Sequence, residues 1–233
     1  AYTRYNPGDH DAQGFDSDWN CRRTVIQYNF SHHNDLGFLL LCNNGRGGFN
    51  EDTLVRYNIS YADGGDVVRF SGPVTGARLV HNTFVLAPGM THPMKGFAPT
   101  VIRHKSWNGW SSDILWAANV IVHAEAGVGY VFGESTANRF LCNAYAGVLP
   151  AELPPDPQAL RLDPRFPAVT PARLDRAAVI EAFTPAPDSP LRGRALSLVG
   201  QARLDFAGRS TRSPDEPAAP GALAVAGPWR EAP

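Results

Sequence analysis

The chain has 233 residues, with 21 Lys and Arg against 22 Asp and Glu, a formal net charge of −1 and 43 % hydrophobic residues. A near-neutral chain lacks the clustered basic face that phosphate neutralisation requires, so we expect no nucleic-acid partner. No apolar run approaches the roughly 20 residues that cross a bilayer, so we expect no membrane span. The length suffices for one sizeable core.

A repeat organises the first 150 residues: a short run of β-forming residues followed by an asparagine. An apolar residue stands three positions before each asparagine, on the inward side of a strand whose side chains alternate. An asparagine amide can donate to and accept from its copy in the next repeat, so stacked copies can form a hydrogen-bonded column. The five copies are Asn29, Asn58, Asn82, Asn119 and Asn143.

A second short strand is predicted in most repeats, at residues 37–41, 66–70, 100–105 and 129–132. No convincing helical period precedes residue 150, which argues against a doubly wound α/β fold. We therefore predict an all-β fold, a parallel β-helix solenoid over residues 1–150. An irregular C-terminal arm over residues 151–210 is expected to pack on the solenoid, with a loose Pro/Ala-rich tail over residues 211–233.

The repeat begins at about residue 24, without an obvious cap over its first turn. Solenoids need polar terminal caps to stay soluble. Either the acidic stretch at residues 9–18 forms this cap, or the first turns belong to a missing N-terminal segment or partner chain. We favour the second alternative. The three cysteines, Cys21, Cys42 and Cys142, lack metal-binding spacing and are interpreted as small buried hydrophobes.

Several phrases resemble the right-handed parallel β-helix proteins of the pectate-lyase-like group. They are Thr24-Val-Ile-Gln-Tyr-Asn-Phe-Ser-His, Asn34-Asp-Leu-Gly-Phe-Leu-Leu, Lys105-Ser-Trp-Asn-Gly-Trp and, near the C-terminus, Asp188-Ser-Pro-Leu and Asp205-Phe-Ala-Gly. The resemblance covers about residues 15–210. It implies a right-handed solenoid, a secreted or periplasmic location, and a polysaccharide substrate. The group includes lyases, hydrolases and non-catalytic proteins, so the fold leaves the reaction open.

Strand alternation predicts which side chains of the second strands face outward. The outward set is Val67, Arg69 and Ser71, then Val101, Arg103 and Lys105, then Tyr130, Phe132 and Glu134, and the inward set is Val68, Phe70, Ile102, His104 and Val131. With turns about 4.8 Å apart, Arg69 stacks beside Arg103 and Lys105 beside Glu134. Stacked arginines need an anion. Asp66 and Glu134 can supply it in a purely structural ladder, or an acidic glycan can.

In the functional alternative, β-elimination of a uronate needs a cation for the carboxylate and a base for the C5 proton. Lys105 or Arg103 with a lowered pKa is the candidate base, and Arg69 is the candidate carboxylate clamp. Trp107 and Trp110 follow the same strand. Their rings can stack on sugars or simply pack.

A glycoside hydrolase instead needs two carboxylates about 5–9.5 Å apart, and Asp16, Asp18, Asp35 and Asp66 are the candidates. The paired-aspartate signature of β-helix hydrolases is absent, which favours a lyase. Asp16 and Asp18 are also candidate calcium ligands, against the alternative of a solvated acidic loop. His33, beside His32, is a candidate substrate-binding residue, against the alternative of an ordinary turn.

Overall fold

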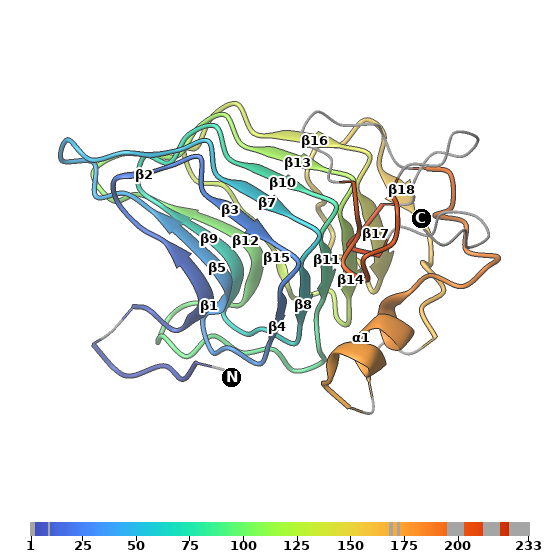
Figure 1. Ribbon diagram of the computed structural model, residues 1–233. Helices are drawn as coiled ribbons and strands as arrows, with labels where there is room; N and C mark the ends of the chain where they lie inside the picture. The colour runs from blue at the N-terminus through green and yellow to red at the C-terminus, as the bar shows by residue number, and fades with distance from the viewer. Residues whose placement is uncertain are drawn as a thin grey trace.

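The computed structural model describes residues 3–8, 10–167, 170–171, 173–194, 203–211 and 220–223. Nearly every regular element in these residues is a short β-strand, and all the strands that pair do so in parallel (Figure 1). The polypeptide winds through three sheets in turn and then climbs by one strand in each. This architecture is the predicted parallel β-helix.

Each sheet takes one strand from each successive turn of chain. The first sheet contains β1 (Gln13–Ser17), β5 (Gly37–Cys42), β9 (Asp66–Ser71), β12 (Thr100–Lys105) and β15 (Gly129–Val131). The second contains β3 (Val25–Gln27), β7 (Leu54–Arg56), β10 (Arg78–Val80), β13 (Leu115–Ala117) and β16 (Arg139–Leu141). The third contains β4 (Phe30–His32), β8 (Ile59–Tyr61), β11 (Thr83–Val85), β14 (Val120–His123), β17 (Ala144–Gly147) and β18 (Leu160–Arg161). A short pair, β2 (Cys21–Arg22) and β6 (Asn50–Glu51), lies between the first two sheets along the chain.

The predicted asparagine column forms at the bend between the second and third sheets. Each side-chain amide nitrogen donates to the next copy's Oδ1 at 2.9–3.0 Å, and each backbone N–H donates to the same oxygen. Asn143 at the far end donates to the Asp156 carboxylate at 3.0 Å, so an aspartate of the next turn completes the column. The residue before each asparagine has positive φ, which makes the bend sharp; these residues are Tyr28, Tyr57, His81, Ala118 and Cys142.

The core is a stack of apolar side chains enclosed by the three sheets. Phe70, Phe84 and Phe140 pack around Trp116, which is almost completely buried. Burial of this kind contributes about 25 cal/mol per Å² of apolar surface. Val67 and Val101, predicted to face outward, are buried in the same apolar cluster.

The register of β15 differs from the prediction. Ile102 pairs with Tyr130 and Arg103 with Val131, because the β12–β15 register shifts between Thr100 and Ile102. A shift of one residue exchanges the two faces of a strand. Tyr130 is therefore inward, with its hydroxyl 3.0 Å from His123 Nε2, and Val131 is outward and exposed.

The acidic stretch at residues 9–18 is not a separate cap over the first turn. Its second half forms β1, which pairs with β5 as a strand of the first sheet, and Phe15 packs edge-on against Phe38. The solenoid in this chain thus begins earlier than the asparagine repeat indicates. The asparagine pattern did not predict β1 because no asparagine of the column precedes this strand.

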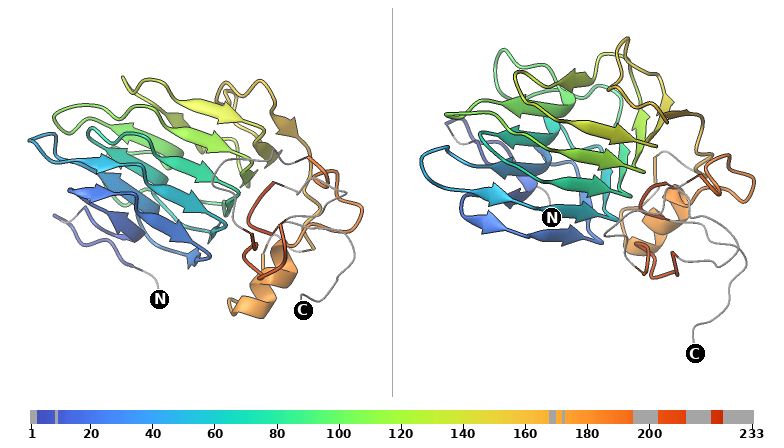
Figure 2. Two further views of the ribbon diagram at one scale, coloured as in Figure 1. Left: turned by 45° about the horizontal axis from the view of Figure 1, so that its top comes forward. Right: turned by 90° about the horizontal axis from the view of Figure 1, so that it is seen from above.

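The predicted C-terminal arm crosses the outer face of the third sheet (Figures 1 and 2). It contains α1 (Arg176–Phe183), whose Asp175 side chain caps the first turn, and Phe183 packs against Tyr61 of β8. The arm is not wholly irregular, since β18 extends the third sheet. Most of the predicted loose tail lies outside the described residues, but Gly221 and Ala222 hydrogen-bond to Ala118 and Thr83 of the solenoid.

Asn119→Ala should lower the free energy of unfolding by about 2–4 kcal/mol, because it leaves the N–H groups of buried Asn82 without their acceptor. Asn29→Ala, at the half-buried end of the column, should cost about 1 kcal/mol, since it removes only one side-chain donor bond. Urea unfolding followed by circular dichroism measures both. Equal costs for the two variants would contradict a cooperative column.

Candidate functional site

The outward face of the first sheet brings together residues from five successive turns. Strand register aligns two outward columns across it. One column runs Asp16, Leu40, Arg69, Arg103 and Val131, and the other runs Cys42, Ser71 and Lys105. The predicted stacking of Arg69 beside Arg103 is therefore confirmed.

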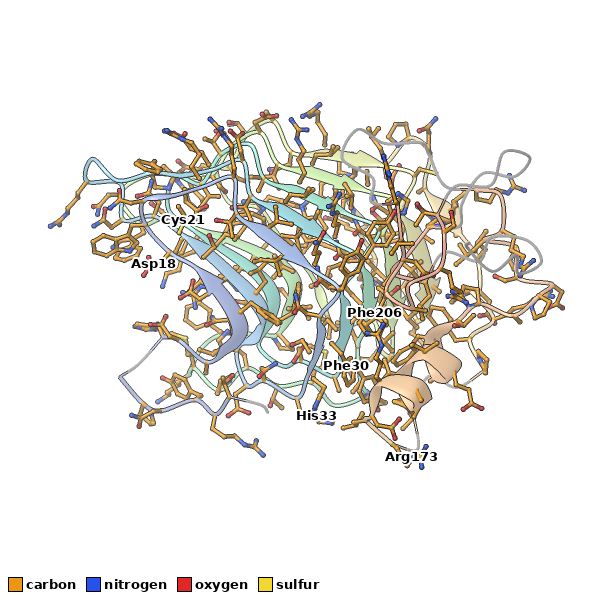
Figure 3. The ribbon with its side chains drawn as sticks, viewed as in Figure 1. Asp18, Cys21, Phe30, His33, Arg173 and Phe206 are labelled. Atoms are coloured by element: carbon orange, nitrogen blue, oxygen red, sulfur yellow. The ribbon has the colours of Figure 1, made fainter. Side chains whose placement is uncertain are left out.

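A cleft of about 520 Å³ opens on this face, which we call the Arg69 cleft. Its floor comes from β5 and β9, and its sides come from the chain before and after β1 and from the end of β12. Its lining residues are Gly8, His10, Asp11, Asp18, Trp19, Leu40, Cys42, Arg69, Ser71, Lys105, Ser106 and Trp107. Figure 3 shows the labelled Asp18 beyond the end of β1, where this cleft begins.

Arg103 is neutralised by Asp66 and does not line the cleft. Its Nε donates to Asp66 Oδ1 at 2.6 Å and a terminal nitrogen donates to Ala98 O at 2.7 Å. Burial opposes ionisation of Asp66, but His92 and Arg103 outweigh it and hold the pKa of this carboxyl below its ordinary value. Asp66 and Arg103 therefore form a structural ion pair, which makes Arg103 a poor base and Asp66 a poor hydrolytic acid.

Arg69 has no such ion pair within the described part of the chain. The residue is only 5 % exposed, and its Nε has no hydrogen-bond partner among the described residues. Burial, which disfavours the charged form, lowers the pKa of Arg69, and Asp66 opposes this effect. Buried polar groups without partners are rare in proteins. Arg69 therefore places a positive charge without a hydrogen-bonded counter-ion at the floor of the cleft, which suits an anionic ligand.

Lys105 lines the same cleft beside Arg69. Burial and the positive charge of Arg69 lower the pKa of Lys105, so the neutral amine is more accessible than on an ordinary surface lysine. Its Nζ lies 5.6 Å from the centre of the Phe97 ring. The predicted stacking of Lys105 beside Glu134 is wrong, because β15 ends at Val131 and Glu134 is exposed in the turn beyond it.

Two exposed tryptophans meet at the rim. Trp107 contacts Trp19 edge-to-face, with ring centroids 5.7 Å apart. Gly72 allows the turns on both sides to approach, since it has positive φ and a Cβ there would collide with Asn43 O and lie 3.0 Å from Trp107 O. Trp110, the other predicted sugar-stacking residue, lies against Gly133 and does not line the cleft. Sequence reasoning missed Trp19, although an apolar ring beside the acidic stretch was a usable signal.

Asp16 and Asp18 lie together, as the sequence predicted, with Cys42 as their third neighbour. Ligand atoms of the three residues lie within 4.8 Å of one another, and the Cys42 thiol donates to Asp18 Oδ1 at 2.9 Å. Burial, together with the charges of Asp18 and Asp11, raises the pKa of Asp16 to about 6. Calcium takes six to eight oxygen ligands. Two carboxylates and a protonated thiol fit it poorly, so no step is assigned to calcium here.

Asp35 and His33 lie at a different corner of the solenoid, at the turn between β4 and β5 (Figure 3). Asp35 accepts hydrogen bonds from Arg4 and from the backbone N–H of Tyr5, which anchors the N-terminal segment. His33 has positive φ, and its Nδ1 lies 3.2 Å from that of His32. Neither residue lines the Arg69 cleft.

A scan against protein-family models finds no match for this chain, and a search of curated proteins finds no similar sequence. The described residues include no helix with the length and apolar character that crossing a bilayer requires.

Asp16 should make stability depend on pH. Its folded-state pKa of about 6 exceeds the ordinary value of 3.8, so the native state binds this proton more tightly and loses stability as pH rises between these values. Asp16→Asn should therefore gain thermal stability relative to the parent above pH about 6, and lose that advantage below pH about 4. Glu152→Gln, at an exposed position, is the control. A pH-independent difference in melting temperature between Asp16→Asn and the parent would contradict the raised pKa.

Proposed function

We propose that the protein is a polysaccharide lyase that cleaves a uronate-containing glycan by β-elimination in the Arg69 cleft. The observation that carries the proposal is buried Arg69, whose Nε has no hydrogen-bond partner among the described residues, next to the lysine whose pKa is lowered. One cation is thus available for the substrate carboxylate and one amine for its acidic proton. The resemblance to the pectate-lyase-like group supports the same choice.

In the proposed reaction, Arg69 binds the uronate carboxylate and stabilises the negative charge that develops when the C5 proton leaves. The neutral amine of Lys105 takes that proton. The electron pair of the C5–H bond forms the C4–C5 double bond, and the C4–O4 bond breaks. The leaving oxygen takes a proton from the resulting Lys105 ammonium or from water, so the step needs neither oxidant nor reductant.

The remaining lining residues suit a sugar polymer. The exposed Trp19 and Trp107 rings offer apolar faces on which sugar rings can stack. Leu40 and Ser71 give the floor both an apolar and a hydroxyl surface. Because polysaccharides of this kind occur outside the cytoplasm, the proposal carries with it a secreted or periplasmic location.

Retaining glycoside hydrolysis is the second candidate function, favoured by one observation. Asp16 and Asp18 form a close carboxyl pair, and the raised pKa of Asp16 suits a general acid. Retaining enzymes hold their two carboxyl groups about 5–5.5 Å apart. The thiol that occupies Asp18 Oδ1, and the absence of Asp16 from the cleft lining, rank this reaction below elimination.

A non-catalytic glycan-binding role is the remaining alternative. It would be favoured if all the cations of the face were neutralised by neighbouring carboxylates. Arg103 is neutralised by Asp66, whereas no ion pair is present for Arg69 or Lys105 among the described residues. The two free cations therefore favour an enzyme.

Incubation with a panel of acidic and neutral polysaccharides, with and without calcium, tests the proposal. Elimination produces both new reducing ends and the ultraviolet absorbance of a conjugated double bond, whereas hydrolysis produces reducing ends alone. Lys105→Met should lower the rate at least ~100-fold. Arg69→Met should raise KM and lower kcat, because the clamp binds the substrate carboxylate and binds the transition state, which carries more negative charge, still more strongly.

Lys95→Met is the matched control, since Lys95 is the chain's other lysine and lies exposed outside the cleft. It should retain the parent's activity. Full activity in Lys105→Met would exclude elimination by this base. Reducing ends without absorbance, lost in Asp18→Asn, would establish hydrolysis instead.

A further inference from the structure

The shape of the Arg69 cleft bears on which part of a glycan it can accept. An enzyme that acts within a polymer needs a groove open at both ends, so that the chain can continue past the site. The solenoid axis, which crosses the strands of the first sheet, is the natural course for such a groove. The cleft follows this axis from β1 to β12 but takes no lining residue from β15.

The insertion between β11 and β12 packs beside the β12 end of the cleft, where its Phe97 ring lies near the lining residue Lys105. Arg103 donates to Ala98 O of this insertion, and the Phe97 ring lies 5.2 Å from the Arg103 guanidinium and 5.6 Å from Lys105 Nζ. The His92 ring stacks on the Phe97 ring, with the ring centroids 5.1 Å apart. These contacts, together with buried Asp66, hold the insertion against the outer side of β12.

The chain before β1 closes the opposite end. Gly8, His10 and Asp11 all line the cleft. The segment that contains them is anchored by Thr3, whose hydroxyl donates to Ala12 O at 2.6 Å and whose backbone N–H donates to Asn34 Oδ1 at 2.8 Å. Figure 1 shows this segment looping beside β1.

The Trp19–Trp107 contact closes the third side. It joins the loop after β1 to the loop after β12, and both of these loops line the cleft. The second of these loops is held in place by Asn108, which donates to Asn44 O at 2.9 Å. The cleft volume of about 520 Å³ falls in the range of sites for a single small ligand, about 300–1,000 Å³.

We infer that the Arg69 cleft is a blind pocket that binds the end of an acidic glycan chain, with the terminal uronate on Arg69, and not an internal stretch of polymer. The inference rests on the proposed function, because it takes an acidic glycan to be the ligand. It adds that the preferred substrates are oligosaccharides and chain ends. Each cleavage then releases one short unit from the end of the chain.

Calorimetric titration with size-fractionated polygalacturonate and alginate tests the inference by binding alone. For any polymer that the parent cleaves, the titration uses the Lys105→Met variant instead, so that the polymer stays intact. The probes are a short fraction and one roughly tenfold longer, each expressed as the concentration of chains. A pocket for chain ends gives both fractions the same Kd per chain. A groove for internal stretches makes the longer fraction bind roughly tenfold more tightly per chain, because it offers more sites.

Trp107→Ala and Trp107→Phe form the matched pair of variants. The residue is 39 % exposed, so both should fold. The alanine variant opens the rim and should bind the longer chains more tightly per chain than the short ones, whereas phenylalanine should keep the two affinities equal. A tenfold length dependence in the parent would overturn the blind pocket and leave the proposed function standing. No binding of either polymer would overturn both.

Discussion

The in-register stacking of successive turns is the constraint on which the rest of the structure depends. The asparagine column enforces it, because each amide after Asn29 accepts two hydrogen bonds from the preceding turn and donates one to the following turn. All of this takes place at a buried bend where an unpaired backbone N–H would be costly. The Asp156 carboxylate completes the column at its far end, where a sixth asparagine would otherwise stand.

Register fixes the chemistry of the outer face as well as the core. Once β5, β9 and β12 are aligned, Leu40, Arg69 and Arg103 must form a column, and the charges of the two neighbouring arginines must be accommodated together. The fold neutralises one arginine with Asp66 and leaves the Nε of the other without a partner among the residues that the structure describes. A solenoid can sustain such an imbalance because its stability comes from the stacked interior, not from surface ion pairs.

The insertion between β11 and β12 shows how a regular solenoid acquires a specific site. The longest interval between column asparagines, from Asn82 to Asn119, contains it. Its Ala98 carbonyl accepts a hydrogen bond from Arg103, and its Phe97 ring lies beside Lys105 at one end of the cleft. Insertions in repeat proteins bulge out on the faces of the stack without disturbing the column, so they can vary with function.

The sequence by itself determined the repeat, the parallel architecture and the stacking of Arg69 beside Arg103, because a strand has a period of two and a ladder residue recurs in frame. It placed Asp16 and Asp18 together, since they are two residues apart in one acidic stretch. Only the tertiary structure decided which arginine keeps a free charge, because that depends on Asp66 meeting Arg103 across a turn.

The same limit applies to the rest of the cleft. The one-residue shift before β15 exchanged the faces of Tyr130 and Val131, and no local pattern signals such a shift. Trp19 met Trp107 across three turns of the solenoid, and Cys42 entered the carboxyl pair from a neighbouring strand. These contacts join residues far apart in the chain, and their partners are set by how the turns stack, not by any local property of the sequence.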